Sequence, residues 1–144
     1  MKLDHLLQAY KLNNIEAELK EINTDNEKAG VIMFENGISA SYLLDDEDIV
    51  IAMKVFFNCL GRNNFKVEAQ INHVIKIITI MQNTIMLLSN IPQKECNMIL
   101  EKLGLFDNTF IQGKQIKHLE HEYKIEVIRE LLCLSINEIE LMKR

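Results

Sequence analysis

Residues 67–90 constrain the fold more than any other segment of the chain. Apolar side chains recur there at alternating spacings of four and three residues, at Val67, Ile71, Val74, Ile78, Met81, Ile85 and Leu88. This spacing places them along one side of an α-helix, as in helices that pack against another helix. A second stripe lies beside the first, at Ile77, Ile80, Thr84 and Leu87. We therefore expect a long central helix that is covered on two sides, by a sheet and by one further body.

The further body has two candidates, the first helix of the same chain and a second copy of the chain. Three heptads are a short run for a coiled coil, and a core helix of a globular domain is the more common source of such a pattern. The surplus of apolar surface nevertheless leads us to expect a homodimer.

A hairpin is expected before this helix. Asn36-Gly37 separates two apolar runs, and this dipeptide tolerates the positive φ that a type I′ turn requires. Residues 30–35 are therefore expected to pair with residues 38–44. In the second strand apolar and small polar residues alternate, with Ile38, Ala40, Tyr42 and Leu44 on one face and Ser39 and Ser41 on the other.

Four consecutive carboxylates, Asp45, Asp46, Glu47 and Asp48, follow the hairpin. A calcium loop of the EF-hand type needs Gly at its sixth position and Glu at its twelfth, and no register that starts at the first or second of these acids supplies them. The acids therefore either form a turn into a third strand over residues 49–57 or begin a helix over 48–60. The frequent β-branched and aromatic residues favour the strand, which would continue the hairpin as a meander.

The N-terminal segment 2–22 is expected to be helical. It carries two apolar stripes at helical spacing, one at Leu3, Leu6, Leu7 and Tyr10 and another at Leu12, Ile15, Leu19 and Ile22. Asn13 and Glu16 have the spacing of a capping box, which predicts a kink or a restart of the helix at that point. The polar residues 23–30 end in glycine and predict a loop.

The segment after the central helix is punctuated by Pro92 and Gly104, which predict a short helix over 92–103. A loop is expected over 106–113. The tail alternates in a strand-like way, with Leu119, His121, Tyr123, Ile125 and Val127 on one face, followed by Leu132, Leu134 and Ile136. This alternation favours two strands and a terminal helical turn. The alternative is a helical stripe through Ile125, Ile128, Leu132, Ile136 and Ile139, because residues 128–130 lack a turn-forming residue.

Together these segments predict an α+β fold. Antiparallel strands, arranged as a meander and hairpins, would pack on the long central helix, with an N-terminal helix and a short third helix beside it. The chain has 144 residues, with one Pro and five Gly, and no stretch of it has the composition of a linker. We therefore expect a single domain that spans residues 1–144.

Charge and cysteine content argue against several kinds of partner. The net charge of −5 argues against nucleic acid, which requires a basic face. The longest nearly uncharged stretch, 77–91, is short for a membrane span, and the first residues lack the apolar core of a signal peptide. Cys59, Cys96 and Cys133 are odd in number and far apart, as expected for buried thiols in a reducing compartment. We therefore expect a cytoplasmic protein.

No motif for catalysis, a metal or a cofactor is found in the sequence. His118 and His121 are three residues apart rather than four, and Leu119 instead of Glu follows the first of them, so the metalloprotease motif fails. Cys96 lies near the start of a predicted helix, where the pKa of a thiol can fall. A nucleophilic role would also require a histidine base that folding brings near it. We predict no catalytic, metal-binding or cofactor-binding residue.

These observations favour a small non-enzymatic protein-binding module that associates with itself. The expected order of elements is similar to that of small acidic bacterial secretion chaperones, a resemblance of architecture alone, and small acidic inhibitors and immunity proteins fit equally well. Richness in Ile, Lys and Asn suits a bacterial or phage gene. The predicted partner-binding residues are Asp45, Asp46, Glu47 and Asp48. The alternative is a small-molecule-binding domain or an enzyme of unfamiliar type, with a pocket between the sheet and the central helix.

Overall fold

The computed structural model describes residues 1–22, 28–35, 37–58, 67–105, 114–129 and 131–139. Three helices and seven strands occur in this part of the chain, which confirms the predicted α+β fold. The helices are α1 (Leu3–Leu12), α2 (Val67–Ser89) and α3 (Gln93–Lys102). The strands are β1 (Glu18–Glu21), β2 (Lys28–Met33), β3 (Ile38–Leu44), β4 (Val50–Asn58), β5 (Lys114–His118), β6 (His121–Ile128) and β7 (Leu131–Glu138).

The strands form one sheet in the order β1-β2-β3-β4-β7-β6-β5, and every neighbouring pair is antiparallel. It consists of two meanders, β1 to β4 and β5 to β7. The two meanders meet where β4 pairs with β7, for example at Val55 opposite Leu134. The predicted meander is therefore confirmed, and the sheet extends it on the far side of β4.

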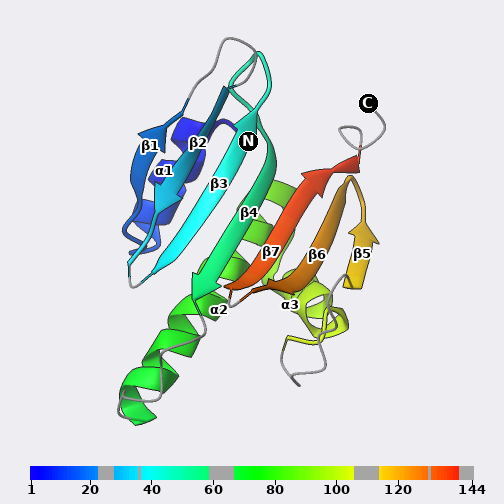
Figure 1. Cartoon of the computed structure of the whole chain (residues 1–144). Helices are drawn as coiled ribbons and strands as arrows, with labels where there is room; N and C mark the ends of the chain where they lie inside the picture. The colour runs from blue at the N-terminus through cyan, green and yellow to red at the C-terminus, as the bar shows by residue number, and fades with distance from the viewer. Residues whose placement is uncertain (23–27, 36, 59–66, 106–113, 130, 140–144) are drawn as a thin grey trace.

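All three helices lie on one face of this sheet (Figure 1). α1 lies behind the strands of the first meander, α2 passes behind the centre, and α3 lies behind the second meander. The core fills the layer between sheet and helices, with Ile32, Met53, Val55, Phe57, Tyr123, Ile125 and Leu134 from the sheet and Leu6, Tyr10, Ile80, Met81, Ile85, Ile99 and Leu100 from the helices. The described helices thus bury one face of the sheet, and none of them lies on the other.

The local signals around the first hairpin are confirmed. β2 and β3 pair as predicted, and Gly37 has a φ of 78°, the positive value that its turn requires. Gly30 also has a reason to lack a side chain, because it lies opposite Tyr42 in this pair. A Cβ there would meet the tyrosine ring and hydroxyl and would lie 2.7 Å from the carbonyl oxygen of Lys20. The segment 49–57 is a strand, β4, rather than the start of a helix.

The prediction of a helix over 2–22 is wrong in its second half. α1 ends at Leu12, and Asn14 adopts a left-handed backbone with φ of 61°, which stops the helix. The chain then enters β1, in which Leu19 lies opposite Ile32 of β2. The second stripe was coincidental, because Leu12 and Ile22, its two ends, are 77% and 59% exposed.

The C-terminal hairpin is confirmed as β6 and β7, and the helical alternative for the tail is wrong. Sequence analysis missed β5, which pairs with β6 across a turn at Leu119, where φ is 54°. Leu119 therefore does not share the face of His121 and is 71% exposed. The predicted helix over 92–103 is confirmed as α3, while the predicted loop 106–113 lies outside the described residues.

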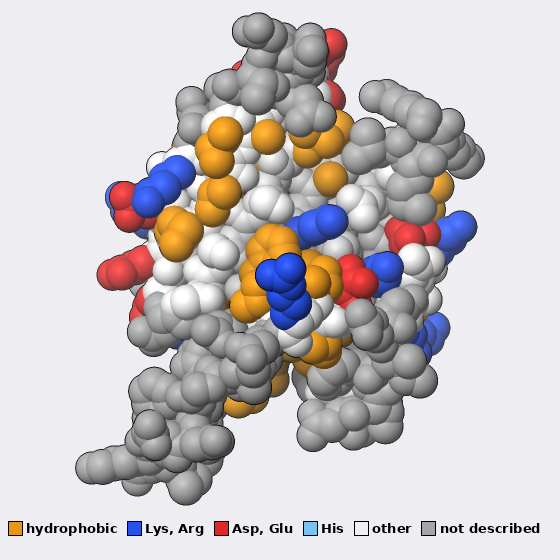
Figure 2. All heavy atoms as spheres, viewed as in Figure 1, with side chains coloured by type: hydrophobic (Ala, Val, Ile, Leu, Met, Phe, Trp, Pro, Cys, Tyr) orange, Lys and Arg blue, Asp and Glu red, His pale blue; other side chains and the backbone are white. Residues whose placement is uncertain are grey.

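Figure 2 shows the face of the sheet that carries no helix, which we call the helix-free face. Its hydrophobic side chains gather in the left half and the centre of the view. Among the described helices, none alone has the length and apolar composition of a membrane span. The segments Val74–Ser89 and Gln93–Lys102 meet those limits only when counted together, across a bend of 115°.

Candidate protein-contact surfaces

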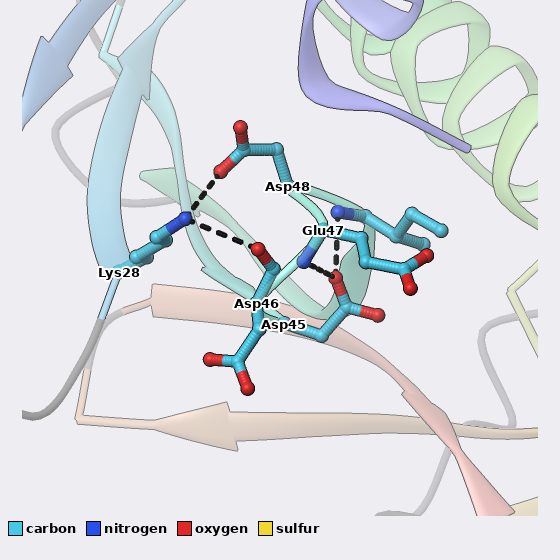
Figure 3. A network of polar contacts seen from close by, with 6 residues as sticks. Lys28, Asp45, Asp46, Glu47 and Asp48 are labelled. Carbon is cyan, nitrogen blue, oxygen red and sulfur yellow. Dashed lines mark hydrogen bonds and ion pairs between the residues drawn. The ribbon is translucent and has the colours of Figure 1, made fainter.

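The acidic run forms an ordered turn between β3 and β4 (Figure 3). One carboxylate oxygen of Asp45, Oδ1, accepts hydrogen bonds from the backbone N–H of Glu47 at 2.9 Å and of Ile49 at 3.0 Å. The backbone closes the same loop, since the N–H of Asp48 donates to the carbonyl of Asp45 at 3.1 Å. This is the local bonding by which aspartate builds a turn. Asp45, the first acid of the run, therefore stabilises the turn.

Asp48, the last acid of the run, forms an ion pair with the neighbouring strand β2. Asp48 has a φ of 65° and pairs through Oδ1 with the Lys28 ammonium of β2 at 2.9 Å. The hydrogen bond to Asp48 and its charge raise the pKa of Lys28. The carbonyl of Asp48 also accepts a hydrogen bond from the N–H of Leu3, and the N–H of Val50 donates to the carbonyl of Met1. The turn thereby fastens the N-terminus of the chain to the end of the sheet.

Asp46 and Glu47 are the two acids whose carboxylates remain available. Their side chains are exposed and take part in no hydrogen bond or ion pair within the described residues. In that part of the chain no group of three or more His, Cys, Asp or Glu side chains is placed to hold a metal ion. The structure thus provides a structural role for half of the run, and its role in partner binding stays a prediction.

The apolar seam of α2 is only partly covered. Met81 and Ile85 are completely buried between the sheet and the other helices. Val74 belongs to the same seam two to three turns earlier, yet it is 52% exposed, and its neighbour Ile75 is 56% exposed. Figure 1 shows the reason, because the N-terminal part of α2 continues past the end of the sheet. We call the segment 67–76 the projecting part of α2.

Among the described side chains, the hydrogen bonds that join α2 to other elements lie in its C-terminal third. Thr84 bonds to Tyr10 of α1 at 2.5 Å, Gln82 donates to Asn97 of α3 at 2.8 Å, and Ser89 bonds to Tyr123 of β6. In the projecting part, where the structure describes the side chains from Val74 onward, Lys76 forms an ion pair with Glu35 at 2.6 Å. The C-terminal half of α2 is therefore bonded to α1, α3 and β6, whereas Val74 of its apolar seam is 52% exposed.

Burial is the main cause of the raised pKa values in the core. Desolvation raises the pKa of Tyr10 and of Tyr123, so that both phenols stay protonated and serve as hydrogen-bond partners of α2. Burial also raises the pKa of the Cys96 thiol to about 11 and raises that of Cys133. A raised pKa suppresses the thiolate, the nucleophilic form of cysteine. These thiols are therefore poor nucleophiles.

The two histidines that we considered as metal ligands are opposite each other in the β5–β6 hairpin. The Nε2 atom of His118 lies 3.1 Å from a carboxylate oxygen of Glu95 on α3, which ties the edge of the sheet to that helix. Burial lowers the pKa of His121, which favours its neutral form. The pair thus contributes to packing between β5, β6 and α3.

The predicted pocket between the sheet and the central helix is not supported at the centre of this layer. Ile80 and Ile85 of α2, with Met53 and Ile136 of the sheet, are at most 1% exposed and belong to one continuous core. Side chains fill the space that a ligand would need.

The surface that sequence analysis missed is the helix-free face. The residues of this face occupy the strand positions that alternate with the core. On β4, for example, Ala52, Lys54 and Phe56 alternate with the buried Met53, Val55 and Phe57. Only the sheet order shows that these positions from separate strands adjoin one another. No family model, no curated protein and no solved structure matches this chain.

Proposed function

We propose that this chain is a non-enzymatic protein-binding module that pairs with a second copy of itself through the projecting part of α2. The observation that carries the proposal is the exposure of Val74 in a seam whose later members, Met81 and Ile85, are fully buried. An apolar stripe of heptad spacing fits another helix with the same spacing, and a second copy supplies one. Pairing would remove this apolar surface from water.

Two further observations support a role in binding rather than catalysis. The described thiols are buried with raised pKa values, which disfavours a nucleophilic cysteine. The layer between the sheet and α2 is packed with apolar side chains. A stable contact between proteins needs roughly 800 Å² from each partner, so the interface would extend from the projecting part of α2 onto the adjoining end of the sheet. In this proposal Asp46 and Glu47 remain the predicted acidic contacts for a partner.

Light scattering after size-exclusion chromatography tests self-association. We expect the unchanged protein to show twice the 16.8 kDa of one chain and Val74→Asp to show one chain, because a carboxylate in an apolar interface is costly. Leu119→Asp is the matched control, since Leu119 is an exposed leucine on the β5–β6 turn. It should leave the dimer intact.

A mass of one chain for the unchanged protein, at every concentration that stays in solution, would contradict the proposal. Loss of the dimer in Leu119→Asp as well as in Val74→Asp would also contradict it, because the effect would then not depend on the seam of α2. Circular dichroism of each variant establishes that the fold is kept.

A further inference from the structure

The helix-free face consists of two unlike halves. A sheet that packs on one face and meets water on the other normally carries polar side chains on its wet face. The β6–β7 half is mostly polar, with Glu122, Lys124, Glu126, Ser135 and Asn137, although Cys133 is buried there and Ile128 and Leu131, at its end, are 42% and 36% exposed. The half over β2, β3 and β4 is more apolar, because six of the nine positions whose side chains the structure describes there are apolar. These are Ala29, Val31, Met33, Leu43, Ala52 and Phe56, and the other three are Ser39, Ser41 and Lys54.

This half, which we call the β2–β4 face, is open to solvent where the structure describes it. Met33 is 37% exposed, and Val31, Leu43 and Phe56 are half-buried although the described helices all lie on the opposite side. Figure 2 shows hydrophobic side chains on this side of the molecule, with basic side chains at the centre of the view. Serine and alanine lie between them, so the surface is shallow and the strands are accessible.

Lys54 is the one charged residue among the nine positions. It is exposed and has no ion pair or side-chain hydrogen bond within the described residues. The strand register places it in one row with Lys20 of β1 and Lys124 of β6, and the neighbouring row of the same face ends in Glu18 of β1 and contains Glu126 of β6. Lys124 pairs with Glu126 at 3.4 Å, whereas Lys20 has no ion pair in the described part of the chain. Since strands are about 4.8 Å apart, Lys20 and Lys54 are separated by about 14 Å across three strand spacings.

Unpaired lysines within an apolar surface are complementary to carboxylates within an apolar segment. We propose that the β2–β4 face binds a peptide segment of another protein in which Asp or Glu residues are interspersed with apolar side chains. The inference rests on the proposed function in one respect, that the chain acts by binding protein. It concerns a different surface and a different partner from the pairing through α2.

Two other occupants fit the face less well. Two copies of the chain placed face to face would bring the lysine row of one against that of the other, and like charges repel. A single nucleic-acid strand would need several aromatic side chains and a basic face, whereas Phe56 is the one aromatic residue among the nine positions and the chain has a net charge of −5. Charge and composition therefore favour an acidic peptide.

Selection from a library of random peptides displayed on phage tests the proposal. The baits are the unchanged protein, Lys54→Glu and the matched control Lys94→Glu, which makes the same change at an exposed lysine of α3 on the other side of the molecule. We expect the unchanged protein and Lys94→Glu to enrich peptides that combine Asp or Glu with Leu, Ile or Phe. The best of these peptides should bind Lys54→Glu about tenfold more weakly, and Lys54→Glu should enrich basic peptides instead.

Enrichment that does not depend on residue 54, or no enrichment at all, would overturn the proposal. So would binding of a fluorescent oligonucleotide of thymidine that Lys54→Glu abolishes, or a change in oligomeric mass caused by Lys54→Glu. If Lys54→Glu does not fold, Lys54→Gln serves in its place and should lose the preference for acidic peptides. Because pairing through α2 is measured separately with Val74→Asp, failure of the peptide selection leaves that result standing, and failure of pairing does not alter the selection.

Discussion

Asp45 illustrates how one side chain at a strand end determines the path of the chain. Its carboxylate accepts two backbone hydrogen bonds, from Glu47 and Ile49, and thereby holds the turn in which Asp48 reaches Lys28. The next acid, Asp46, contributes to the same turn through its backbone carbonyl, at 3.4 Å from the Lys28 ammonium, and its carboxylate points away (Figure 3). Neighbouring acids of identical chemistry thus have different structural roles.

We therefore expect unequal effects when these two acids are replaced by alanine. Asp45→Ala removes the acceptor of two backbone N–H groups and should lower the free energy of unfolding by about 1–2 kcal/mol. Asp46→Ala should change it by less than about 0.5 kcal/mol, as surface substitutions usually do. Urea denaturation followed by circular dichroism measures both. Equal losses in the two variants would show that the turn does not depend on the Asp45 carboxylate.

At the scale of elements, α1 and α2 are joined by a buried hydroxyl pair. The Thr84 hydroxyl lies 2.7 Å from the carbonyl oxygen of Ile80 on its own helix and 2.5 Å from the Tyr10 hydroxyl. A threonine hydroxyl has one proton, so it donates to Ile80 and accepts from Tyr10. Both residues are 0% exposed, and Tyr10 also contacts Phe34 edge to face at a centroid distance of 5.2 Å. The phenol therefore depends on Thr84, whereas Thr84 retains a partner without the phenol.

This difference predicts an order of stabilities. Tyr10→Phe removes one hydrogen bond and should cost about 1 kcal/mol. Thr84→Val leaves the phenol buried without an acceptor and should cost about 2–3 kcal/mol, even though valine has nearly the shape of threonine. Adding Tyr10→Phe to Thr84→Val should recover part of that loss. Urea midpoints of the three variants provide the test, and a double variant less stable than Thr84→Val would contradict the assignment of donor and acceptor.

The elements that the sequence predicted correctly carry their signal in adjacent residues. Asn36-Gly37 marks the first hairpin, and Pro92 marks the start of α3. The prediction errors arose where pairing with residues distant in the sequence determines the local structure. The helical spacing from Leu12 to Ile22 did not show that Asn14 would leave the helix, because β1 forms through pairing with β2. The polar strand β5 has no alternation of its own and depends on β6 for its hydrogen bonds.

The candidate surfaces were less predictable for the same reason. The apolar seam of α2 was predicted from its spacing in the sequence, but the exposure of Val74 depends on where the sheet ends. The β2–β4 face could not be predicted from the sequence, because its nine positions come from three strands and adjoin one another only in the assembled sheet. For the acidic run, sequence excluded a calcium loop, but Lys28 as the partner of Asp48 follows from the pairing of β2 with β3.

At the scale of the whole molecule, stability is expected to fall in alkaline solution. Burial raises the pKa of Cys96 from 9.0 to about 11 and also raises that of Tyr10. The folded state therefore holds these protons more tightly than the unfolded state does. The stability linked to Cys96 is fully present below pH 9 and is lost as the pH rises from 9 to about 11, at a cost of about 2–3 kcal/mol.

Cys96→Ser isolates this contribution, because serine does not titrate in this range and its hydroxyl can still donate to the Gln82 carbonyl oxygen, which the thiol approaches at 3.7 Å. Urea denaturation at intervals from pH 8 to 11 should show a smaller decline for the variant than for the unchanged protein. Parallel declines in the two proteins would mean that the Cys96 thiol ionises as easily in the fold as in the unfolded chain.

The place of β7 has a consequence for biosynthesis. It is the last of the described strands in the chain, yet it lies between β4 and β6. Until Leu131–Glu138 leaves the ribosome, the described strands form two unconnected sheets, and the backbone groups along one edge of the long strand β4 lack their partner. A message cut short just before this strand therefore yields an aggregation-prone fragment instead of a slightly smaller protein.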